Sequence, residues 1–479
     1  MAGVMKHILF PLLTISLLLS GCNATNIEAS SSTNDSSLLS FSLASNSEPS
    51  KSSISSPGTS SYSKRDYSYN PMYEPYISRQ YYLNHIGDIY SVWKEYRGDG
   101  TTIALIDAGF KGDHEDFVFE DGTSKVSNES ASFTTSGNKT TTKVGVRYVD
   151  AGEESHGTFC ASVASAGLNG KGVIGVAPNA KLLLLKTDCK PKSIVEAFYY
   201  AADHGATVIS ISIGSYDNYE GDLDNDGSNL KTVFNDAVKY CYDKNIPVIS
   251  AGGNGGNTRK AYPGSVPYVI GVGGLASNSS SDVWSESTYN ASSSDRHIDV
   301  FAPSDGMYGC CNYGNKKYDG GWKGTSFAAP QVAGMAALYF QKNPNATAKQ
   351  FEDDLYASCH KIDNSAKYGY GRVDVGRLLD ISTNKDIKVT IKTSWSSVYV
   401  YAWNLDKNKE LKAWPGTKLS KSTNEYTIDI NPNEYDSIVI NDGGSKKSPD
   451  LYVSSFIYDN TYSLLSTTSE NDYLIGKYV

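Results

Sequence analysis

The sequence predicts an α/β domain with a mainly parallel sheet flanked by helices, followed by an all-β module. Two short runs dominated by β-branched and aliphatic residues, 101–106 and 182–186, are typical of buried parallel strands. Residues 331–338 are mostly small and apolar, as expected of a helix packed closely on such a sheet. From Ile387 onward the pattern changes to period two, which indicates half-buried strands. A chain of 479 residues, 39% of them hydrophobic, can form one large core and a small second domain.

Residues 1–21 are expected to be a lipoprotein signal peptide. A weakly basic start precedes the apolar run 8–19, which is too short to span a bilayer, since that takes about 20 residues. The run leads into Leu19-Ser20-Gly21-Cys22, which resembles a bacterial lipobox and implies a lipid on Cys22. The alternative is an ordinary cleavage site with an incidental cysteine. We therefore expect an extracytoplasmic protein on the bacterial cell surface, lipid-anchored to the membrane.

Residues 22–65 are dominated by serine, with asparagine and threonine, and hold too few apolar residues to offset the loss of chain entropy. We expect them to form a disordered tether. The next unit, residues 66–381, carries the chemical motifs. The net charge of −9 argues against a nucleic-acid partner.

Two of these motifs place a carboxylate and an imidazole at element ends. Asp107 directly follows the strand-like run 101–106, and Ala108-Gly109 breaks the pattern after it. In open α/β sheets, ligands bind beyond the carboxyl ends of strands, which is where Asp107 would lie. His156 opens the segment 156–164, whose small residues predict a helix in close contact with another element.

The third motif is the stretch 324–330, Gly-Thr-Ser-Phe-Ala-Ala-Pro, which runs into the helix-like residues 331–338. Pro330 is tolerated only near a helix start, so Ser326 is expected at a helix N-terminus, where free amides favour developing negative charge. An ordinary N-cap serine is the alternative. Asp, His and Ser in this chain order form one of the known orders of a hydrolytic triad.

These motifs together resemble those of subtilisin-like serine proteases, the subtilase family, over roughly residues 73–380. The resemblance implies a three-layer α/β domain and a serine endopeptidase that needs no cofactor for catalysis. In that family the histidine, here His156, takes the proton of the serine, here Ser326, while Asp107 orients the imidazole. Residues 248–255 resemble the turn that carries the oxyanion-hole amide, which maps to Asn254. Ala108 replaces a hydroxyl residue common in the family, and we expect this to modulate the rate.

The resemblance also implies two segments that flank an extended polypeptide substrate. One would pair with the substrate as an added strand, and the other would form the opposite wall of the primary pocket. Both consist of small or apolar residues, which predicts a roomy cleft, and neither holds an acidic residue that would indicate a preference for basic side chains. A plain turn is the alternative for the glycines. The segments are Ser212, Ile213 and Gly214, and Ala251, Gly252 and Gly253.

Structural calcium is a further hypothesis. Three aspartates occupy alternate positions before a turn glycine, as in calcium loops, namely Asp222, Asp224 and Asp226. Val233 stands where an EF-hand would need glutamate, so an EF-hand is excluded, and a solvated acidic loop is the alternative. The subtilase resemblance implies a second site, with side-chain oxygens from Asp116 and Asn169.

Residues 387–465 form the last expected unit, with 466–479 as a tail. This unit contains the alternating run 398–403, the stretch Ala413-Trp414-Pro415-Gly416 and the run 437–444. The resemblance is to a small β-sandwich starch-binding module of the kind fused to amylases. It implies binding of an α-glucan such as starch or glycogen by stacking sugar rings on aromatic side chains. The residues would be Tyr399, Tyr401 and Trp414. The alternative is that these rings form the module's core or pack on the protease.

Several smaller expectations complete the interpretation. Residues 121–143 are expected to form a surface loop, and His85 and His114 to lie at the surface. Without Cys22, six cysteines remain in an extracellular protein, so disulfides are possible. Cys160 is expected to be free and buried.

Two alternatives to the function remain. In one, the protein is a glycan-binding surface lipoprotein whose protease fold is inactive. In the other, the protease is active and the C-terminal sandwich only stabilises the catalytic domain.

Overall fold

The computed structural model describes most of residues 70–478. The exceptions within that range are 151, 153–154, 217–229, 278–281, 314–315, 382–385, 405–408, 423–424, 433, 436, 445, 449–450, 454–460 and 471–472. The expected signal peptide, Cys22, the tether and the acidic loop with Asp222, Asp224 and Asp226 lie outside the described residues. Within the described part, the helices are too short or too polar to cross a membrane.

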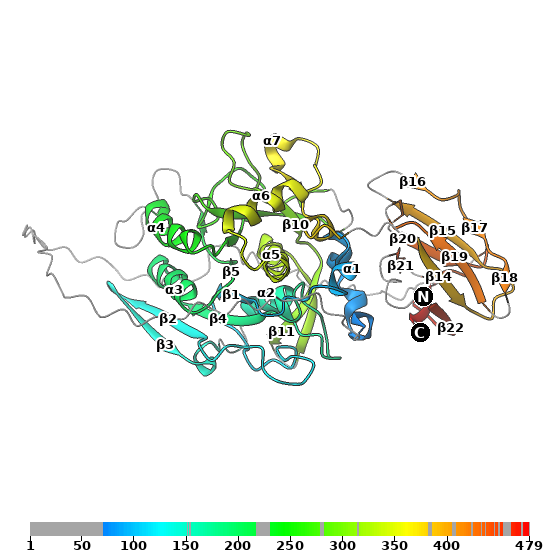
Figure 1. Ribbon diagram of the computed structural model, residues 1–479, viewed down its shortest axis with the longest axis horizontal. Helices are drawn as coiled ribbons and strands as arrows, with labels where there is room; N and C mark the ends of the chain where they lie inside the picture. Colours follow the sequence, from blue (N-terminus) through cyan, green and yellow to red (C-terminus); the bar gives the residue numbers. More distant parts are fainter. Residues whose placement is uncertain are drawn as a thin grey trace, which may run out of the picture.

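A nine-stranded sheet forms the centre of the larger domain (Figure 1). Its strand order is β13-β10-β9-β7-β5-β1-β4-β2-β3, and all neighbours are parallel except β2 and β3. The bounds are β1 (Thr102–Asp107), β2 (Ala131–Ser136), β3 (Lys139–Val144), β4 (Lys181–Thr187), β5 (Val208–Ile211), β7 (Val248–Ala251), β9 (Val269–Leu275), β10 (Val300–Pro303) and β13 (Gly371–Arg372). The predicted parallel α/β sheet is thereby confirmed, with β1 near its middle.

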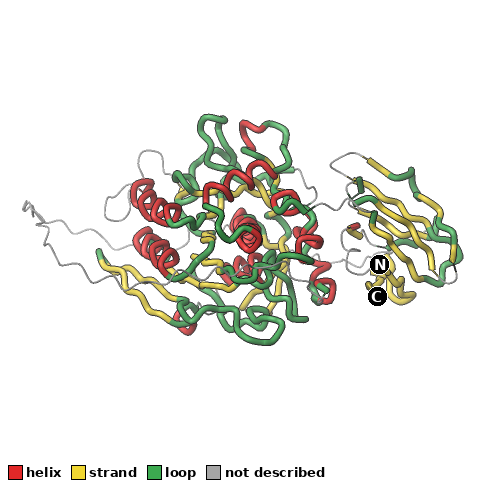
Figure 2. The backbone as a smooth tube through the Cα atoms, viewed as in Figure 1, coloured by secondary structure: helices red, strands yellow, loops and turns green. Residues whose placement is uncertain are grey.

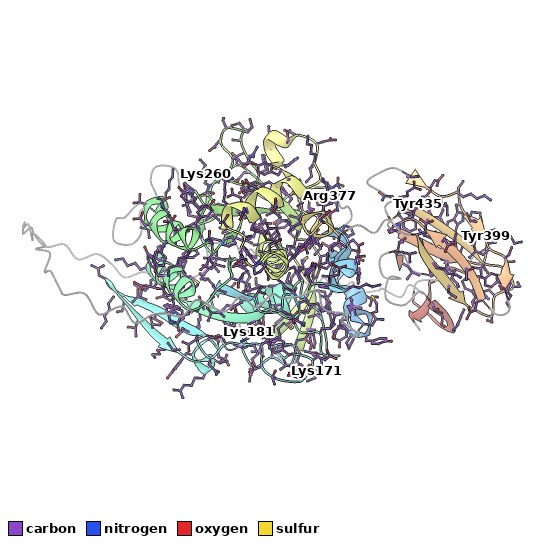
Figure 3. All side chains as sticks on the ribbon, viewed as in Figure 1. Lys171, Lys181, Lys260, Arg377, Tyr399 and Tyr435 are labelled. Atoms are coloured by element: carbon purple, nitrogen blue, oxygen red, sulfur yellow. The ribbon has the colours of Figure 1, made fainter. Side chains whose placement is uncertain are left out.

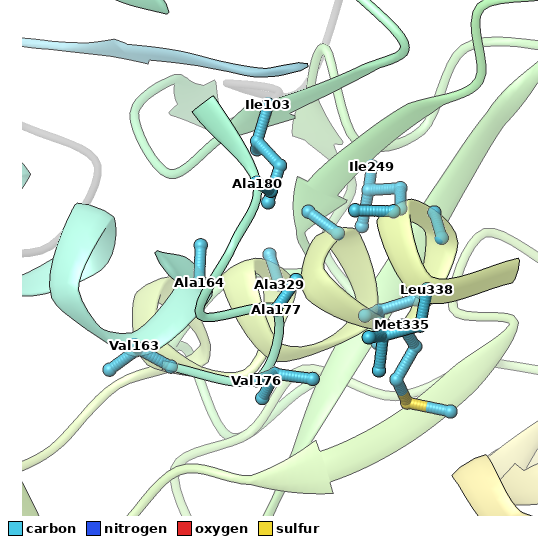
Figure 4. Close-up of a cluster of buried hydrophobic side chains, with 14 of the residues drawn as sticks. Ile103, Val163, Ala164, Val176, Ala177, Ala180, Ile249, Ala329, Met335 and Leu338 are labelled. Carbon is cyan, nitrogen blue, oxygen red and sulfur yellow. The ribbon is translucent and has the colours of Figure 1, made fainter. Parts of the chain in front are cut away.

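Helices cover both faces of this sheet, which gives three layers (Figures 1 and 2). Because side chains alternate along a strand, β1 contributes to two cores. Ile103 and Leu105 lie in the core that contains the residues of α2 (His156–Ser165) and α5 (Ala329–Lys342). Ala104 and Ile106 lie in the core with α3 (Pro191–Asp203) and α4 (Leu230–Asp243). Figure 4 shows the first of these cores, where small residues such as Ala164 and Ala329 let the two helices pack closely.

The remaining elements of this domain lie around the sheet. They are α1 (Ile89–Trp93), α6 (Ala348–Ser358), α7 (Ser365–Tyr368), α8 (Val375–Leu378), the 3-10 turns η1 (Pro71–Tyr73), η2 (Ile77–Arg79), η3 (Tyr81–His85), η4 (Val146–Tyr148) and η5 (Thr325–Phe327), the pair β6 (Ser215–Tyr216) and β8 (Ala261–Tyr262), and the hairpin β11 (Met307–Tyr313) and β12 (Lys316–Trp322).

Two expectations for the stretch between Asp107 and His156 were wrong. Residues 121–143 do not form only a surface loop, because β2 and β3 lie within or overlap this segment and extend the sheet. The physical reason is the alternation in β2, where Ala131 and Phe133 point into the core beside α3 while their neighbours face outward. His114 is 5% exposed, since the ring of Tyr318 in β12 covers it, whereas His85 is half-buried.

The C-terminal module consists of two five-stranded sheets, as the period-two pattern predicted (Figure 3 labels Tyr399 and Tyr435 in it). Alternate residues of β15, such as Val400 and Ala402, face a core shared with β14, β19 and β20. The strands are β14 (Ile387–Lys392), β15 (Tyr399–Asn404), β16 (Lys409–Glu410), β17 (Thr417–Lys418), β18 (Lys421–Ser422), β19 (Glu425–Ile430), β20 (Ser437–Asn441), β21 (Leu451–Tyr452), β22 (Thr461–Glu470) and β23 (Tyr473–Tyr478).

The expected tail, residues 466–479, instead contributes strands to this module. β22 pairs in parallel with β14 and antiparallel with β23, which ends at Tyr478. The pairing with β14 runs through Thr461, Tyr462 and Ser463, inside the expected module, and the tail residues of β23 then pair with the N–H and C=O groups on the other side of β22. The structure therefore extends the module beyond residue 465.

Candidate active site

Asp107 and His156 form a hydrogen-bonded pair at the carboxyl edge of the central sheet. Asp107 is the last residue of β1 and is 1% exposed, while His156 is the first residue of α2. The Nδ1 atom of His156 lies 2.9 Å and 3.0 Å from the two carboxylate oxygens of Asp107. The carboxylate also accepts a hydrogen bond from the backbone N–H of Ala108, at 2.8 Å. An imidazole that donates its Nδ1–H in this way keeps Nε2 available as a base.

The close approach of these two elements depends on Gly157. A Cβ atom at this position would lie 2.9 Å from the Cβ of Asp107 and 2.3 Å from the carbonyl oxygen of Gly109. Contacts this short exclude any side chain. Glycine after His156 therefore lets the first turn of α2 rest directly on the end of β1.

Ser326 lies in the 3-10 turn η5, immediately before α5. Its Oγ donates a hydrogen bond to the carbonyl oxygen of Ser212 at 3.2 Å, and Ser212 Oγ donates to the carbonyl oxygen of Ser326 at 2.8 Å. Ala328, not Ser326, is the N-cap residue of α5, so the ordinary N-cap alternative does not apply. The ring of His156 lies 5.7 Å from the ring of Phe327, which brings the imidazole beside the η5 turn.

Asn254 follows β7 and is held by the residue that precedes Ser326. Its Oδ1 accepts hydrogen bonds from the backbone N–H of Thr325 at 2.8 Å and from the Thr325 hydroxyl at 2.7 Å. The Thr325 hydroxyl in turn accepts a hydrogen bond from the N–H of Gly253 at 3.0 Å. Because the acceptor end of the amide is fully engaged, its Nδ2 donors are turned to the other side. Sequence reasoning missed Thr325, whose only signal is a hydroxyl directly before Ser326.

The two segments expected to flank the substrate lie side by side. β5 and β7 are parallel neighbours, with Ile211 opposite Ser250, so the segments that begin at Ser212 and Ala251 leave the same edge of the sheet. Their small residues predicted a roomy cleft, but one large side chain joins the two segments. The side chain of Tyr216, two residues beyond Gly214, crosses from the first segment to the second, where its oxygen accepts a hydrogen bond from the N–H of Asn254 at 2.5 Å. The sequence pattern gave no sign of this contact.

Cys160 lies on α2, four residues after His156, and is 1% exposed, as predicted. Its Sγ donates to the carbonyl oxygen of Ser326 at 3.3 Å, and burial raises the pKa of the thiol well above its usual value. The side chain is therefore a neutral packing residue at neutral pH. Free buried thiols are also found at Cys241, Cys310, Cys311 and Cys359.

Asp116 and Glu74 are two buried carboxylates beside the loop 167–173. Asp116 Oδ2 accepts a hydrogen bond from the N–H of Val173 at 2.9 Å, and Glu74 Oε1 accepts one from the N–H of Gly170 at 2.9 Å. Asp116 Oδ1 and Glu74 Oε2 are buried without a hydrogen-bond partner. Burial raises the pKa of Asp116 to about 7 and that of Glu74 to about 8, and the proximity of Asp116 contributes to the latter shift.

Asp116 and Glu74 each bury one carboxylate oxygen without a hydrogen-bond partner, and carboxylate oxygens are the ligands that calcium prefers. Asn169, the other expected ligand, uses its Oδ1 to accept a hydrogen bond from the N–H of Lys171. Glu74 was not foreseen, since nothing in the sequence around it announces a ligand. His114 lies close by but has both ring nitrogens engaged, with Asp116 N–H at 3.2 Å and the Lys317 carbonyl oxygen at 3.0 Å.

The aromatic residues expected to contact glucan lie outside the core of the C-terminal module. Trp414 is 52% exposed, and its ring lies 5.6 Å from that of Tyr401. Tyr401 in turn stacks on Trp403 at 5.4 Å and donates its hydroxyl to Glu410 at 2.8 Å. Tyr399 is half-buried on the same face of β15. The core itself is formed by other residues, so the first alternative, that these rings are the core, is wrong.

Comparison with known proteins agrees with this architecture. The model of the subtilase family matches residues 98–371, and that of starch-binding module 26 matches residues 389–452. Subtilisin DY of Bacillus licheniformis is 30% identical over 289 residues, which cover 58% of this chain and 91% of the relative. Thermitase of Thermoactinomyces vulgaris is 30% identical over 310 residues, which cover 63% of this chain and 96% of the relative.

Among solved structures, the epidermin leader peptide processing serine protease of Staphylococcus aureus is similar with a TM-score of 0.53. It is 25% identical, and the alignment covers 64% of this chain and 82% of that chain. The chain belongs to the subtilase family of serine endopeptidases, as the motifs around Asp107, His156 and Ser326 predicted. Its C-terminal residues carry the predicted starch-binding module.

Proposed function

We propose that this subtilase hydrolyses peptide bonds with Ser326 as nucleophile, His156 as base and Asp107 as the residue that orients it. The observation that carries the proposal is the Asp107–His156 pair beside the η5 turn, on which Thr325 also fixes Asn254. Each member comes from a different element, and the sheet brings these elements to one edge.

Each residue has one role in the proposed mechanism. With Nδ1 bonded to Asp107, His156 takes the Ser326 proton at Nε2 as Oγ attacks the carbonyl carbon of the substrate, and the carboxylate stabilises the imidazolium. The resulting oxyanion is bound by Nδ2 of Asn254 and the backbone N–H of Ser326. His156 then donates the proton to the leaving amine. Water then attacks the acyl group on Ser326 with His156 again as base, and the acid product is released.

Replacement of the nucleophile tests this assignment. Ser326→Ala should lower kcat on a fluorogenic peptide by ~10⁴-fold or more, the scale known for loss of a triad member. The exposed Ser294 offers a matched control, because Ser294→Ala changes the same atoms away from the site. If purified Ser326→Ala protein still cleaved the peptide, the assignment would be wrong. If wild-type protein were equally inactive, the rival of an inactive glycan-binding scaffold would be favoured.

We further propose that the C-terminal module binds α-glucan on the surface formed by Tyr401 and Trp414, with Tyr399 at the edge. The match to a starch-binding module and the exposure of Trp414 support this. Stacked rings outside a core suit the C–H face of a sugar, while the sugar hydroxyls stay in water. The alternative role is stabilisation of the protease domain, and deletion of the module separates the two roles.

Calcium is proposed as a structural ion held by Glu74 and Asp116. Bound there, it would neutralise two buried carboxylates and link the N-terminal segment to the loop 167–173. It would take no part in bond cleavage. The support for this proposal is that Glu74 Oε2 and Asp116 Oδ1 are buried without a hydrogen-bond partner.

The cellular location is proposed from the sequence alone. The apolar run 8–19 and the lipobox-like Leu19-Ser20-Gly21-Cys22 support secretion and a lipid anchor at Cys22 on the outer face of a bacterial membrane. The serine-rich residues 22–65 would then separate the protease from the lipid surface.

A further inference from the structure

Tyr216 joins the two segments that flank the substrate. It belongs to the chain that continues from Gly214, yet its phenol oxygen reaches the N–H of Asn254, which follows the opposite segment. Its ring also lies against Gly253. A Cβ atom on that glycine would be 2.9 Å from the Tyr216 oxygen and 3.1 Å from a ring carbon. The ring therefore fills space between the segments that their small residues would otherwise leave open.

Three independent contacts hold this ring in place. The backbone of Tyr216 pairs with Ala261 in the ladder between β6 and β8. The guanidinium of Arg259 lies over the ring, 5.0 Å from its centroid, in a cation–π contact. The phenol oxygen is bonded to Asn254 N–H and is also a hydrogen-bond partner of the Thr288 hydroxyl. Moving the ring aside would break all of these side-chain contacts.

We propose that Tyr216 limits the depth of the primary pocket, so that the enzyme prefers a short side chain on the residue whose carbonyl carbon Ser326 attacks. This inference rests on the proposed function and adds the substrate class. A methyl or hydroxymethyl side chain needs little depth beyond the backbones of the two segments. A phenylalanine or leucine side chain requires the space that the ring occupies.

The free energy needed to displace the Tyr216 ring determines how strongly the enzyme prefers a short side chain. If Tyr216 swung away, the N–H of Asn254 would lose its partner, and a backbone donor that is left unpaired in a half-buried site costs free energy. That N–H belongs to the residue whose side chain binds the oxyanion. Accommodation of a large substrate side chain would therefore also disturb catalysis. Selectivity should appear in kcat/KM and not in binding alone.

The experiment compares two peptide p-nitroanilides, Ala-Ala-Pro-Ala and Ala-Ala-Pro-Phe, with the full-length protein. Wild-type enzyme should cleave the alanine substrate with the higher kcat/KM. Tyr216→Ala should raise the ratio of kcat/KM for phenylalanine over alanine by at least about 10-fold, the smallest effect expected from several carbon atoms of pocket volume. Tyr216→Phe keeps the ring without its hydroxyl, so the wild-type preference should remain while kcat falls.

Two controls make the result decisive. Tyr268→Ala removes a tyrosine ring that is 43% exposed and rests on Tyr242, so it should leave the ratio unchanged. A wild-type preference for phenylalanine, or an unchanged ratio in Tyr216→Ala, would overturn the inference while hydrolysis itself upheld the proposed function. Absence of hydrolysis of both substrates, together with absence of casein hydrolysis, would instead count against the proposed function on which the inference depends.

Discussion

The side chain of Asn254 is oriented by the hydrogen bonds that its Oδ1 atom accepts. Both hydrogen bonds to its Oδ1 come from Thr325, so the amide cannot rotate without losing them. Since Thr325 precedes Ser326 in the chain, the proposed oxyanion donor and the proposed nucleophile are held together. Such preorganisation is what makes a hydrogen-bond donor effective toward a transition state.

Loss of this donor should slow the chemical step. We expect Asn254→Ala to lower kcat ~10²–10³-fold with KM nearly unchanged, because the Nδ2 donor acts mainly on the developing oxyanion. Steady-state kinetics on a peptide p-nitroanilide would measure both constants. Asn345→Ala, at an exposed loop position, serves as the control. A loss that appeared only in KM would mean that Asn254 binds substrate and not the oxyanion.

A substitution at Glu74 tests whether Glu74 and Asp116 hold a calcium ion or are two protonated carboxyl groups. With calcium bound, the wild-type melting temperature should rise with ion concentration, since a ligand that binds only the folded state stabilises it by about RT ln(1 + [L]/Kd). Glu74→Gln should remove most of this increase, whereas Glu120→Gln, at an exposed position, should not. Thermal melting with added calcium and with EGTA would measure the effect. Equal melting temperatures of the wild type in both solutions would contradict the site.

At the scale of elements, the active site depends on how closely α2 approaches β1. The helix begins at His156, and Gly157 lies against Asp107 and Gly109 with no room for a methyl group. The contact fixes the separation of the imidazole and the carboxylate. Small side chains also allow close packing between α2, which begins at His156, and α5, which follows Ser326.

A single added methyl group should therefore separate these elements. Gly157→Ala is expected to lower stability by about 1–3 kcal/mol through overpacking. It should also lower kcat, because the Asp107–His156 hydrogen bonds would lengthen. Urea unfolding and peptide hydrolysis would measure the two effects. Gly444→Ala is a suitable control, since its Cβ would meet only the side chain of Asp442. Wild-type values for Gly157→Ala would show that the two elements can move apart freely.

At the scale of the whole molecule, a protease domain is joined to a module that presents aromatic rings. The two have separate cores, and the ring surface belongs to the second. A module of this kind would concentrate the enzyme on glucan-coated material without altering its chemistry. The proposed lipid anchor at Cys22 would confine the same enzyme to a membrane surface.

Starch binding can be tested on the full-length protein. Wild-type protein should be retarded in a native gel that contains soluble starch, and Trp414→Ala should abolish the retardation because it removes the most exposed ring of the surface. Leu411→Ala changes a neighbouring exposed apolar residue and should retain binding. Unchanged wild-type mobility would contradict glucan binding. If deletion of the module then lowered the melting temperature of the protease, its role would be stabilisation.

Anchoring is a prediction about the N-terminal residues. Cys22→Ala should release the protein into the medium or leave it with an uncleaved signal, because the lipid attaches to that sulfur. Fractionation of cells followed by N-terminal sequencing would show which occurs. Cys189→Ala leaves the lipobox-like residues intact and should stay with the membrane. A Cys22→Ala protein that remained membrane-bound with its signal removed would refute the lipid anchor.

Local patterns in the sequence determined the class of fold and the catalytic motifs. The strand that ends at Asp107 and the helix that starts at His156 could be predicted because strand burial and helix entry depend on neighbouring residues. The alternating face of β15 could be predicted for the same reason. Only the tertiary structure decided the partners of side chains. Tyr216 meets the N–H of Asn254 and Glu74 meets Gly170 across 38 and 96 residues of sequence. Such contacts depend on where the sheet places separate loops, and no periodicity in one segment encodes its distance from another.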